Sequence, residues 1–367
     1  MKKKNLIEIL GSIEDHRIDR KKEHLLTDIV VITISAVICG AENWNQIEMF
    51  GKSKEEWFKS FLKLPNGIPS HDTFNRFFSL LNPDKFEVVF QEWVQTIAKR
   101  IKGELISIDG KTIRGAKEHG KKSSIHMVSA WANTNNLVLG QLKVNEKSNE
   151  ITAIPELLDL LFIEDCIITI DAMGCQTEIA KKIIDQNADY IIAVKGNQKT
   201  LQQNIEDSFR FLKPEDISES IDAGHGRVEQ RKCFVIKNLE HIENTKAWSG
   251  LKTVIKIESE RYIKSTGVTE KSTRIYISSL TDVSAEIVQE YIRSHWSIEN
   301  KLHWTLDVGF HEDASRKRAG NSAQNFSTMN KIALNIVKND KTLKGSVMTK
   351  RLNAGWDQGY LKTILGI

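Results

Sequence analysis

The sequence predicts an α/β protein in which a mixed β-sheet carries helices on its faces and follows an N-terminal helical domain. Three observations support this prediction. Apolar residues recur at helical spacing up to about residue 102. Three strand-like segments then follow one another from Lys102-Gly103 onwards, and after them helices and strands alternate. Strands that come first in succession and then alternate with helices imply a mixed sheet covered on both faces.

The N-terminal domain, residues 1–102, is predicted to be helical. Apolar repeats mark helices near residues 6–13 and 86–97. Between them, "GIPSHDTFNRFFSLL" places Ser70 as the N-cap of a helix that continues to about Leu81. The exposed polar residues of this helix fit either a DNA-reading element or an ordinary amphipathic helix, and both interpretations stay open.

The segments after residue 102 give the order of elements in the sheet. Three strands come first, followed by a helix, a strand, a second helix and another strand. This order is that of the RNase H-like fold. The predicted segments are strands at 105–108, 126–132, 137–144, 166–170 and 190–194, with helices at about 154–161 and 179–184.

Further segments interrupt and complete this order. Residues of about 205–282 hold three more strand-like runs and predict a β-rich insertion before the last catalytic helix. That helix is expected from Ser284 through "AEIVQEYIRSHWSIENKLHWTLDVGF", and a final helix near residues 323–338. The chain is thus divided into a helical domain (1–102), an RNase H-like domain with the insertion (103–340) and a basic C-terminal tail (341–367).

Two aspartates occupy equivalent positions in this prediction. Asp109 and Asp171 each end a buried strand, and small residues follow each of them. The first and fourth strands are neighbours in an RNase H-like sheet, so the two carboxylates would meet at one edge. Like charges that close repel unless a cation lies between them, and oxygen-only sites prefer Mg²⁺ or Mn²⁺. Two unrelated Asp turns remain the alternative interpretation.

The long helix carries a row of polar side chains. His295, Glu299, His303 and Asp307 recur every four residues and would share one helical face. Apolar neighbours, including Trp296 and Trp304, predict that this helix packs on the sheet with both tryptophans buried. Glu299 is then the natural third carboxylate, with His295 and His303 as supporting residues that orient it.

Three such acids fit phosphodiester chemistry. Asp109, Asp171 and Glu299 would bind two divalent ions that activate a water or a 3′-hydroxyl and stabilise the leaving oxygen. Basic residues would neutralise DNA phosphates around this centre. The candidates are Lys111, Arg114, Lys195, Arg316 and Arg318, together with Arg227 and Arg231 on one face of a strand in the insertion, where a merely solvated charged face is the alternative.

The sequence also resembles a known family over nearly its whole length. Matching stretches are "GIPSHDTFNRFF", "ISIDGKTIRGA", "TIDAMGCQ", "YIIAVKGNQ", "GHGRVEQR" and "RSHWSIENKLHWTLDVGFHEDASRKRAGNSAQN". They resemble the DDE insertion-sequence transposases linked to Rhs elements, the H-repeat-associated proteins. The resemblance implies that Asp109, Asp171 and Glu299 are the catalytic acids and that Mg²⁺ is the cofactor.

One motif of related transposases is not present in register. Hairpin-forming relatives carry a Tyr-Arg-Glu-Lys signature around the glutamate. Counted from Glu299, the Tyr, Arg and Lys positions of this signature hold Ile292, His295 and Leu306. The resemblance therefore does not extend to a hairpin pathway.

Composition limits the remaining possibilities. The net charge is +4, and the four cysteines form no CxxC pair, which argues against zinc-ribbon and disulfide-framework proteins. No apolar stretch reaches the roughly 20 residues of a membrane span, and no GxGxxG motif follows a strand. We expect a cytoplasmic, nucleoid-associated protein whose partner is double-stranded DNA.

Three functions remain open at this point. A transposase would cleave and join DNA at the inverted repeats of an insertion sequence, as a homo-oligomer because two element ends must be held together. An inactive or repurposed DNA-binding relative would keep the fold alone. A nuclease would use the same acids but join nothing, because water and a 3′-hydroxyl need the same activation.

Overall fold

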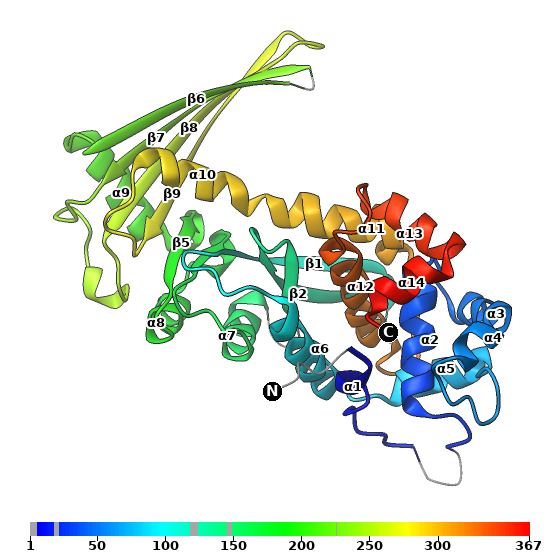
Figure 1. Ribbon diagram of the computed structural model, residues 1–367. Helices are drawn as coiled ribbons and strands as arrows, with labels where there is room; N and C mark the ends of the chain where they lie inside the picture. The colour runs from blue at the N-terminus through cyan, green and yellow to red at the C-terminus, as the bar shows by residue number, and fades with distance from the viewer. Residues whose placement is uncertain (1–5, 18–21, 118–123, 145–148, 225) are drawn as a thin grey trace.

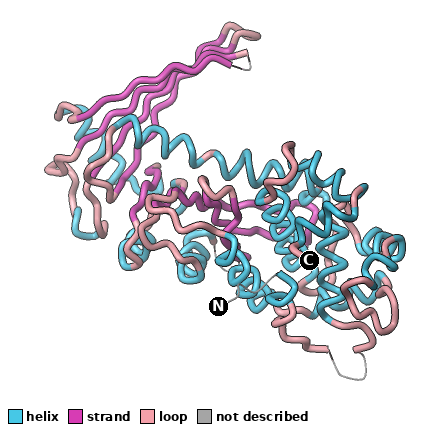
Figure 2. The backbone as a smooth tube through the Cα atoms, viewed as in Figure 1, coloured by secondary structure: helices cyan, strands magenta, loops and turns pink. Residues whose placement is uncertain are grey.

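The computed structural model describes residues 6–17, 22–117, 124–144, 149–224 and 226–367, so one residue of the "GHGRVEQR" motif, His225, lies outside them. Within these ranges the strands form one nine-stranded mixed sheet in the order β3-β2-β1-β4-β5-β9-β8-β7-β6 (Figures 1 and 2). The strands are β1 (Leu105–Lys117), β2 (Ser124–Ala132), β3 (Leu137–Lys143), β4 (Ile167–Ile170), β5 (Asp189–Val194), β6 (Asp216–Gly224), β7 (Arg227–Ile236), β8 (Thr253–Ile263) and β9 (Val268–Ser278).

Helices surround one half of this sheet (Figure 1). The N-terminal helices are α1 (Leu6–Leu10), α2 (Leu26–Ile38), α3 (Trp44–Ser53), α4 (Glu55–Lys59), α5 (His71–Leu80) and α6 (Pro83–Ile97). The later helices are α7 (Glu150–Leu160), α8 (Thr177–Asp185), α9 (Lys199–Phe211), α10 (Ala285–His295), α11 (Trp304–Phe310), α12 (Ser322–Asn339), α13 (Val347–Trp356) and α14 (Gln358–Leu365). No helix in the described ranges is both long and apolar enough to cross a bilayer.

The five strands β1–β5 have the predicted RNase H-like arrangement. β1 pairs with β2 in antiparallel and with β4 in parallel orientation, and β4 pairs in parallel with β5. Apolar residues of α7, α8 and α9 pack with one face of the sheet, and those of α10 pack with the other. Because both faces are covered, the central strands are almost wholly apolar, and this pattern made them recognisable in the sequence.

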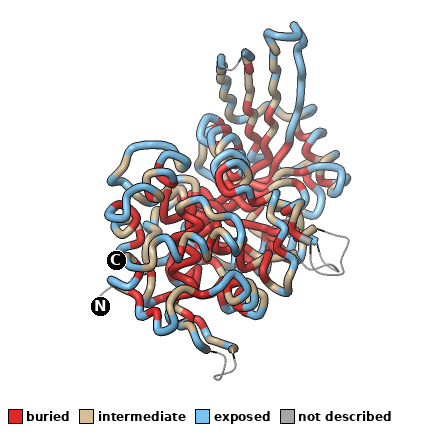
Figure 3. Tube along the Cα trace, turned by 90° about the vertical axis from the view of Figure 1, so that its right-hand side faces the viewer, coloured by how far each residue is buried: buried red, intermediate tan, exposed pale blue. Residues whose placement is uncertain are grey.

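The β-rich insertion extends the same sheet instead of forming a second one. β9 pairs antiparallel with β5 through Ala193 and Tyr276, and β8, β7 and β6 follow it outward. The far ends of these strands project from the body of the molecule as an arm, and their surfaces are largely exposed (Figures 1 and 3). Long strands that outrun their covering helices leave both faces of the sheet in solvent at the tip.

The N-terminal helices do not have a core of their own. Their buried residues, such as Ile32, Phe74 and Phe90, belong to one hydrophobic cluster with Leu306 of α11 and Met329 of α12. The segment expected to be a basic tail, residues 341–367, also joins this cluster, because α13 and α14 bury Ala354, Leu361 and Leu365. That expectation was wrong, because most of the basic residues of this segment belong to two amphipathic helices that pack on the core.

The long helix predicted through residue 310 is interrupted. α10 ends at His295, a π-helical turn spans Ile298–His303, and α11 follows directly. Extra residues in a π turn rotate everything that follows relative to an unbroken α-helix. Side chains that share a face on an ideal helix therefore face different surroundings here.

Candidate functional site

Asp109, Asp171 and Glu299 line one pocket of about 150 Å³ at the edge of the sheet. Each comes from a different element. Parallel pairing aligns Ile108 of β1 with Ile170 of β4, so Asp109 and Asp171, the next residues along, lie together where this pairing ends. Glu299 reaches the pocket from the π-helical turn and is exposed.

Local structure holds the two aspartates in place. Asp109 lies within β1, which continues past it to residue 117 and is longer than the predicted strand. Asp171 begins a short 3₁₀ turn (Ala172–Gly174), and its Oδ1 accepts a hydrogen bond from the Met173 backbone N–H at 2.9 Å. Strand pairing therefore fixes the backbone of Asp109, and the capping hydrogen bond fixes the side chain of Asp171.

The electrostatics of the pocket disfavour negative charge. Burial, together with the neighbouring carboxylates of Asp171, Glu150 and Glu299, raises the pKa of Asp109 to about 7. Burial also raises the pKa of Asp171, with Glu150 adding to the effect and Lys195 opposing it. Acids forced together at this cost are typical of functional sites.

The donor set fits a hard divalent cation. The pocket presents carboxylate oxygens that repel one another, and a cation would relieve this repulsion. Across the described ranges, no three His, Cys, Asp or Glu side chains are already gathered as a metal site. Asp109, Asp171 and Glu299 are the residues that would hold the ion.

A fourth acid, Glu150, was missed from the sequence. It is the first residue of α7, and its Oε1 lies 2.7 Å from Nε2 of His126 on β2. The other ring nitrogen of His126 lies 2.8 Å from Oγ1 of Thr112. A Cβ at Gly110 would lie 2.1 Å from Glu150 Oε1, so a larger residue there would require the Glu150 side chain to move. The sequence feature that could have identified Glu150 is its position as an acid in the first turn of a helix.

The two histidines of the predicted row pair with residues other than Glu299. His295 Nδ1 lies 2.9 Å from Oγ1 of Thr169, and burial lowers its pKa to about 4. His303 Nδ1 lies 3.5 Å from Oδ2 of Asp109. Burial, assisted by the charge of Lys111, lowers the pKa of His303 to about 3, so the ring is neutral. The π turn explains why His303 lies beside Asp109 and not beside Glu299.

Both tryptophans of the long helix are exposed, contrary to the prediction. Trp304 is 62% exposed and Trp296 is 41% exposed. Trp296 lies at the pocket under the guanidinium of Arg274, 5.0 Å from the ring centroid.

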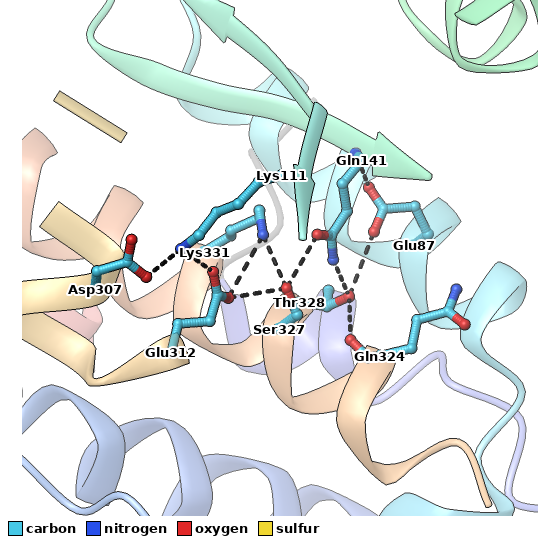
Figure 4. Close-up of polar contacts among 9 residues, drawn as sticks. All are labelled: Glu87, Lys111, Gln141, Asp307, Glu312, Gln324, Ser327, Thr328 and Lys331. Carbon is cyan, nitrogen blue, oxygen red and sulfur yellow. Dashed lines mark hydrogen bonds and ion pairs between the residues drawn. The ribbon is translucent and has the colours of Figure 1, made fainter. Parts of the chain in front are cut away.

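The side chain of Lys111 is largely buried and already paired. It is 11% exposed and forms ion pairs with Asp307, the fourth member of the polar row, and with Glu312 at 3.1 Å (Figure 4). Asp307 comes from α11, and Glu312 from the turn after it. Lys111 therefore ties the strand of Asp109 to these C-terminal elements and is not available as a phosphate ligand.

The Lys111 ion pairs belong to a buried polar network, defined here as Glu87, Lys111, Gln141, Asp307, Glu312, Ser327, Thr328 and Lys331 (Figure 4). Its centre is Glu312, which accepts a hydrogen bond from Ser327 Oγ at 2.9 Å and lies 3.7 Å from Lys331 Nζ. Although burial opposes ionisation, the two lysines hold the pKa of Glu312 down at about 2. The network joins α6, β1, β3, α11 and α12.

The other basic candidates differ in availability. Lys195, Arg227, Arg316 and Arg318 are exposed, as is Arg114, which lies 3.6 Å from Asp313. Arg231 is paired at 2.8 Å with Asp222 and with Glu229, so its charge is already neutralised. Between Arg316 and Arg318, the buried Lys317 lies over the Phe326 ring, 3.3 Å from its centroid. This contact holds the segment 316–318 against α12 and leaves Arg316 and Arg318 exposed.

Comparisons with known proteins agree with this architecture. Residues 7–94 match the family model described as "DDE_Tnp_1-associated", and residues 100–336 match "Transposase DDE domain". The change between the two models lies close to the predicted boundary at residue 102.

Two relatives extend over nearly the whole chain. It is 44% identical over 370 residues to "Putative transposase YncI" of Escherichia coli O157:H7, covering 98% of this chain and 94% of the relative. It is 43% identical over 375 residues to "H repeat-associated putative transposase YhhI" of Escherichia coli strain K12, covering 100% and 98%. A solved piggyBac transposase synaptic complex with hairpin DNA gives a TM-score of 0.46 at 10% identity, covering 98% of this chain and 80% of that one. The family matches and the two relatives show that this chain belongs to the DDE transposase family, as its H-repeat-associated motifs predicted.

Proposed function

We propose that the protein is an active insertion-sequence transposase that cleaves DNA at inverted-repeat ends and transfers the freed strands to a target. The observation that supports this most is the convergence of three acids from three separate elements on one pocket. Family membership supports the reaction class, and the acids identify where it would take place.

The three acids come from different elements of the fold and would bind the metal ions together. Asp109 and Asp171 offer oxygens fixed by the sheet edge, and Glu299 offers one from a more exposed turn. Bound divalent ions would supply activation of the attacking oxygen and charge stabilisation of the leaving oxygen. Glu150 adds negative charge beside Asp109, and His126 holds Glu150 in position.

DNA would approach along the exposed basic residues. Lys195 lines the pocket itself, and Arg114, Arg316 and Arg318 are exposed. Arg227 sits at the start of β7, on the projecting arm. Arg227→Ala should flatten the salt dependence of DNA binding by about one phosphate contact, and Arg231→Ala, whose charge is internally paired, should not. Salt titrations of binding to one duplex measure both slopes.

The function is tested with the intact protein, Mg²⁺ and DNA that carries the ends flanking its gene. Cuts mapped to those ends, followed by joining to a target duplex, are the expected result. Cleavage without joining would identify a nuclease, and binding without cleavage would identify an inactive relative. Each of these two outcomes contradicts the proposal.

The neutral His303 ring is proposed to orient Asp109. His303→Ala should lower the cleavage rate by about 10–100-fold, because partners that orient metal-binding carboxylates typically contribute that much. His303→Gln keeps a donor near Asp109 and should recover part of the loss. Rates under saturating DNA measure the effect, and equal DNA affinity of the three proteins excludes a binding defect. Full activity of His303→Ala would show that Asp109 is oriented without it.

A further inference from the structure

An apolar stripe covers the outward surfaces of α11 and α13. On α11, Trp304 is 62% and Val308 is 46% exposed. On α13, Met348, Leu352 and Trp356 are 43%, 51% and 77% exposed. Members of each row lie four residues apart and therefore share one face of their helix. We name these five residues the α11–α13 stripe.

α13 buries its two basic residues and exposes its largest apolar ones. Lys350 is 7% and Arg351 is 5% exposed, and the small Ala354 is the other buried residue of this helix. Lys350 Nζ donates to the carbonyl oxygen of Asp340 at 2.7 Å, and Arg351 donates to the carbonyl oxygen of Val37 at 2.8 Å. A surface helix ordinarily turns its apolar residues inward and its charges outward. Here the two cations donate hydrogen bonds to carbonyl groups at the C-terminal ends of α12 and α2, and the large apolar side chains are exposed.

The two rows lie on neighbouring helices. α11 and α13 lie side by side in Figure 1, and a Cβ at Gly309 would lie 3.3 Å from Sδ of Met348. Arg351 also lies over the Phe310 ring, 3.9 Å from its centroid, which holds the helices together. From the exposed fractions, the stripe presents roughly 500 Å² of apolar surface, at the upper end of what monomers usually expose.

The chemistry of the stripe selects its partner. A DNA backbone requires cations, and those of α13 point inward. None of the five side chains is charged, so the stripe can face an identical stripe across a two-fold axis without like-charge repulsion. Such a contact buries about 1,000 Å² over both copies, the lower size of a specific interface, and Trp and Met are enriched in interface centres. We propose that a second copy of this chain docks here, stripe against stripe.

Sedimentation equilibrium of the full chain without DNA tests this pairing. The wild-type protein should show a concentration-dependent monomer–dimer equilibrium. Leu352→Lys and Trp304→Lys should each weaken it by about 30-fold or more, the effect of a central interface residue. Ile221→Lys, at a 67% exposed position on the β6 edge, is the matched control and should leave it unchanged.

Thermal unfolding checks that the variants are folded. We expect them to fold because the substituted side chains are exposed. A wild-type chain that is monomeric at every concentration, or a dimer that tolerates both stripe substitutions, would overturn the proposal. Because the assay contains no DNA or metal, its result is independent of whether the proposed catalytic function holds.

Discussion

Glu312→Gln is expected to lower the free energy of unfolding by about 3–5 kcal/mol, because removing one member of a buried ion-pair cluster leaves the others uncompensated. Glu312 is 2% exposed and faces both Lys111 and Lys331, so the glutamine leaves two buried ammonium groups without their anion. Urea denaturation at neutral pH measures the change. Asp313→Asn, at the next position but partly exposed, should cost less than about 1 kcal/mol.

The same network gives the stability a defined pH dependence. The folded pKa of Glu312, about 2, lies below its ordinary value of 4.5. Its contribution is therefore fully present above about pH 4.5 and is lost as the pH falls from there towards 2. The difference in stability between wild type and Glu312→Gln should shrink over that range. A difference that stays constant would show that the carboxylate charge is not what stabilises the network.

Removing any one proposed catalytic acid should abolish cleavage. Asp109→Asn, Asp171→Asn and Glu299→Gln each remove a carboxylate charge at the pocket, and each should lower the cleavage rate by about 1,000-fold or more. DNA affinity should stay within a few-fold of wild type, because phosphate contacts come from other residues. Gel assays of cutting and binding on one DNA separate the two properties.

A carboxylate outside the pocket provides the control for these substitutions. Asp282→Asn, on an exposed loop before α10, should cleave at the wild-type rate. Substantial cutting by one of the three acid variants would remove that residue from the catalytic set, and Glu150 would be the next candidate for it.

Sequence patterns predicted the sheet well and the long helix poorly. Continuous apolar runs placed Asp109 and Asp171 just after the paired segments of β1 and β4, because parallel strands with both faces covered must be apolar throughout. They did not predict that β1 continues past Asp109 to residue 117. The π-helical turn at Ile298–His303 left no such pattern. With an ideal helical period assumed, His303 was assigned to Glu299 and Trp304 to the core, whereas the structure puts His303 beside Asp109 and exposes Trp304.

Long-range partners limited the prediction of charged residues. The sequence indicates a phosphate ligand at Lys111 because its carboxylate partners, Asp307 and Glu312, lie 196 and 201 residues away along the chain. Glu150 was missed for a different reason. It is the first residue of α7 and precedes the apolar repeat by which this helix is recognised in the sequence. Charge can be read from a sequence, but whether a charge is already paired depends on tertiary structure.

The central claim, that Asp109 binds the catalytic metal directly, is tested most directly by changing the softness of its ligand atom. Thiolate binds Mg²⁺ poorly and accepts softer ions such as Mn²⁺ more readily. We expect Asp109→Cys to be inactive with Mg²⁺ and to regain measurable cleavage with Mn²⁺, whereas Asp109→Asn gains no comparable rescue. Equal inactivity of Asp109→Cys with both ions, or activity with Mg²⁺ alone, would contradict the assignment of Asp109 as a metal ligand.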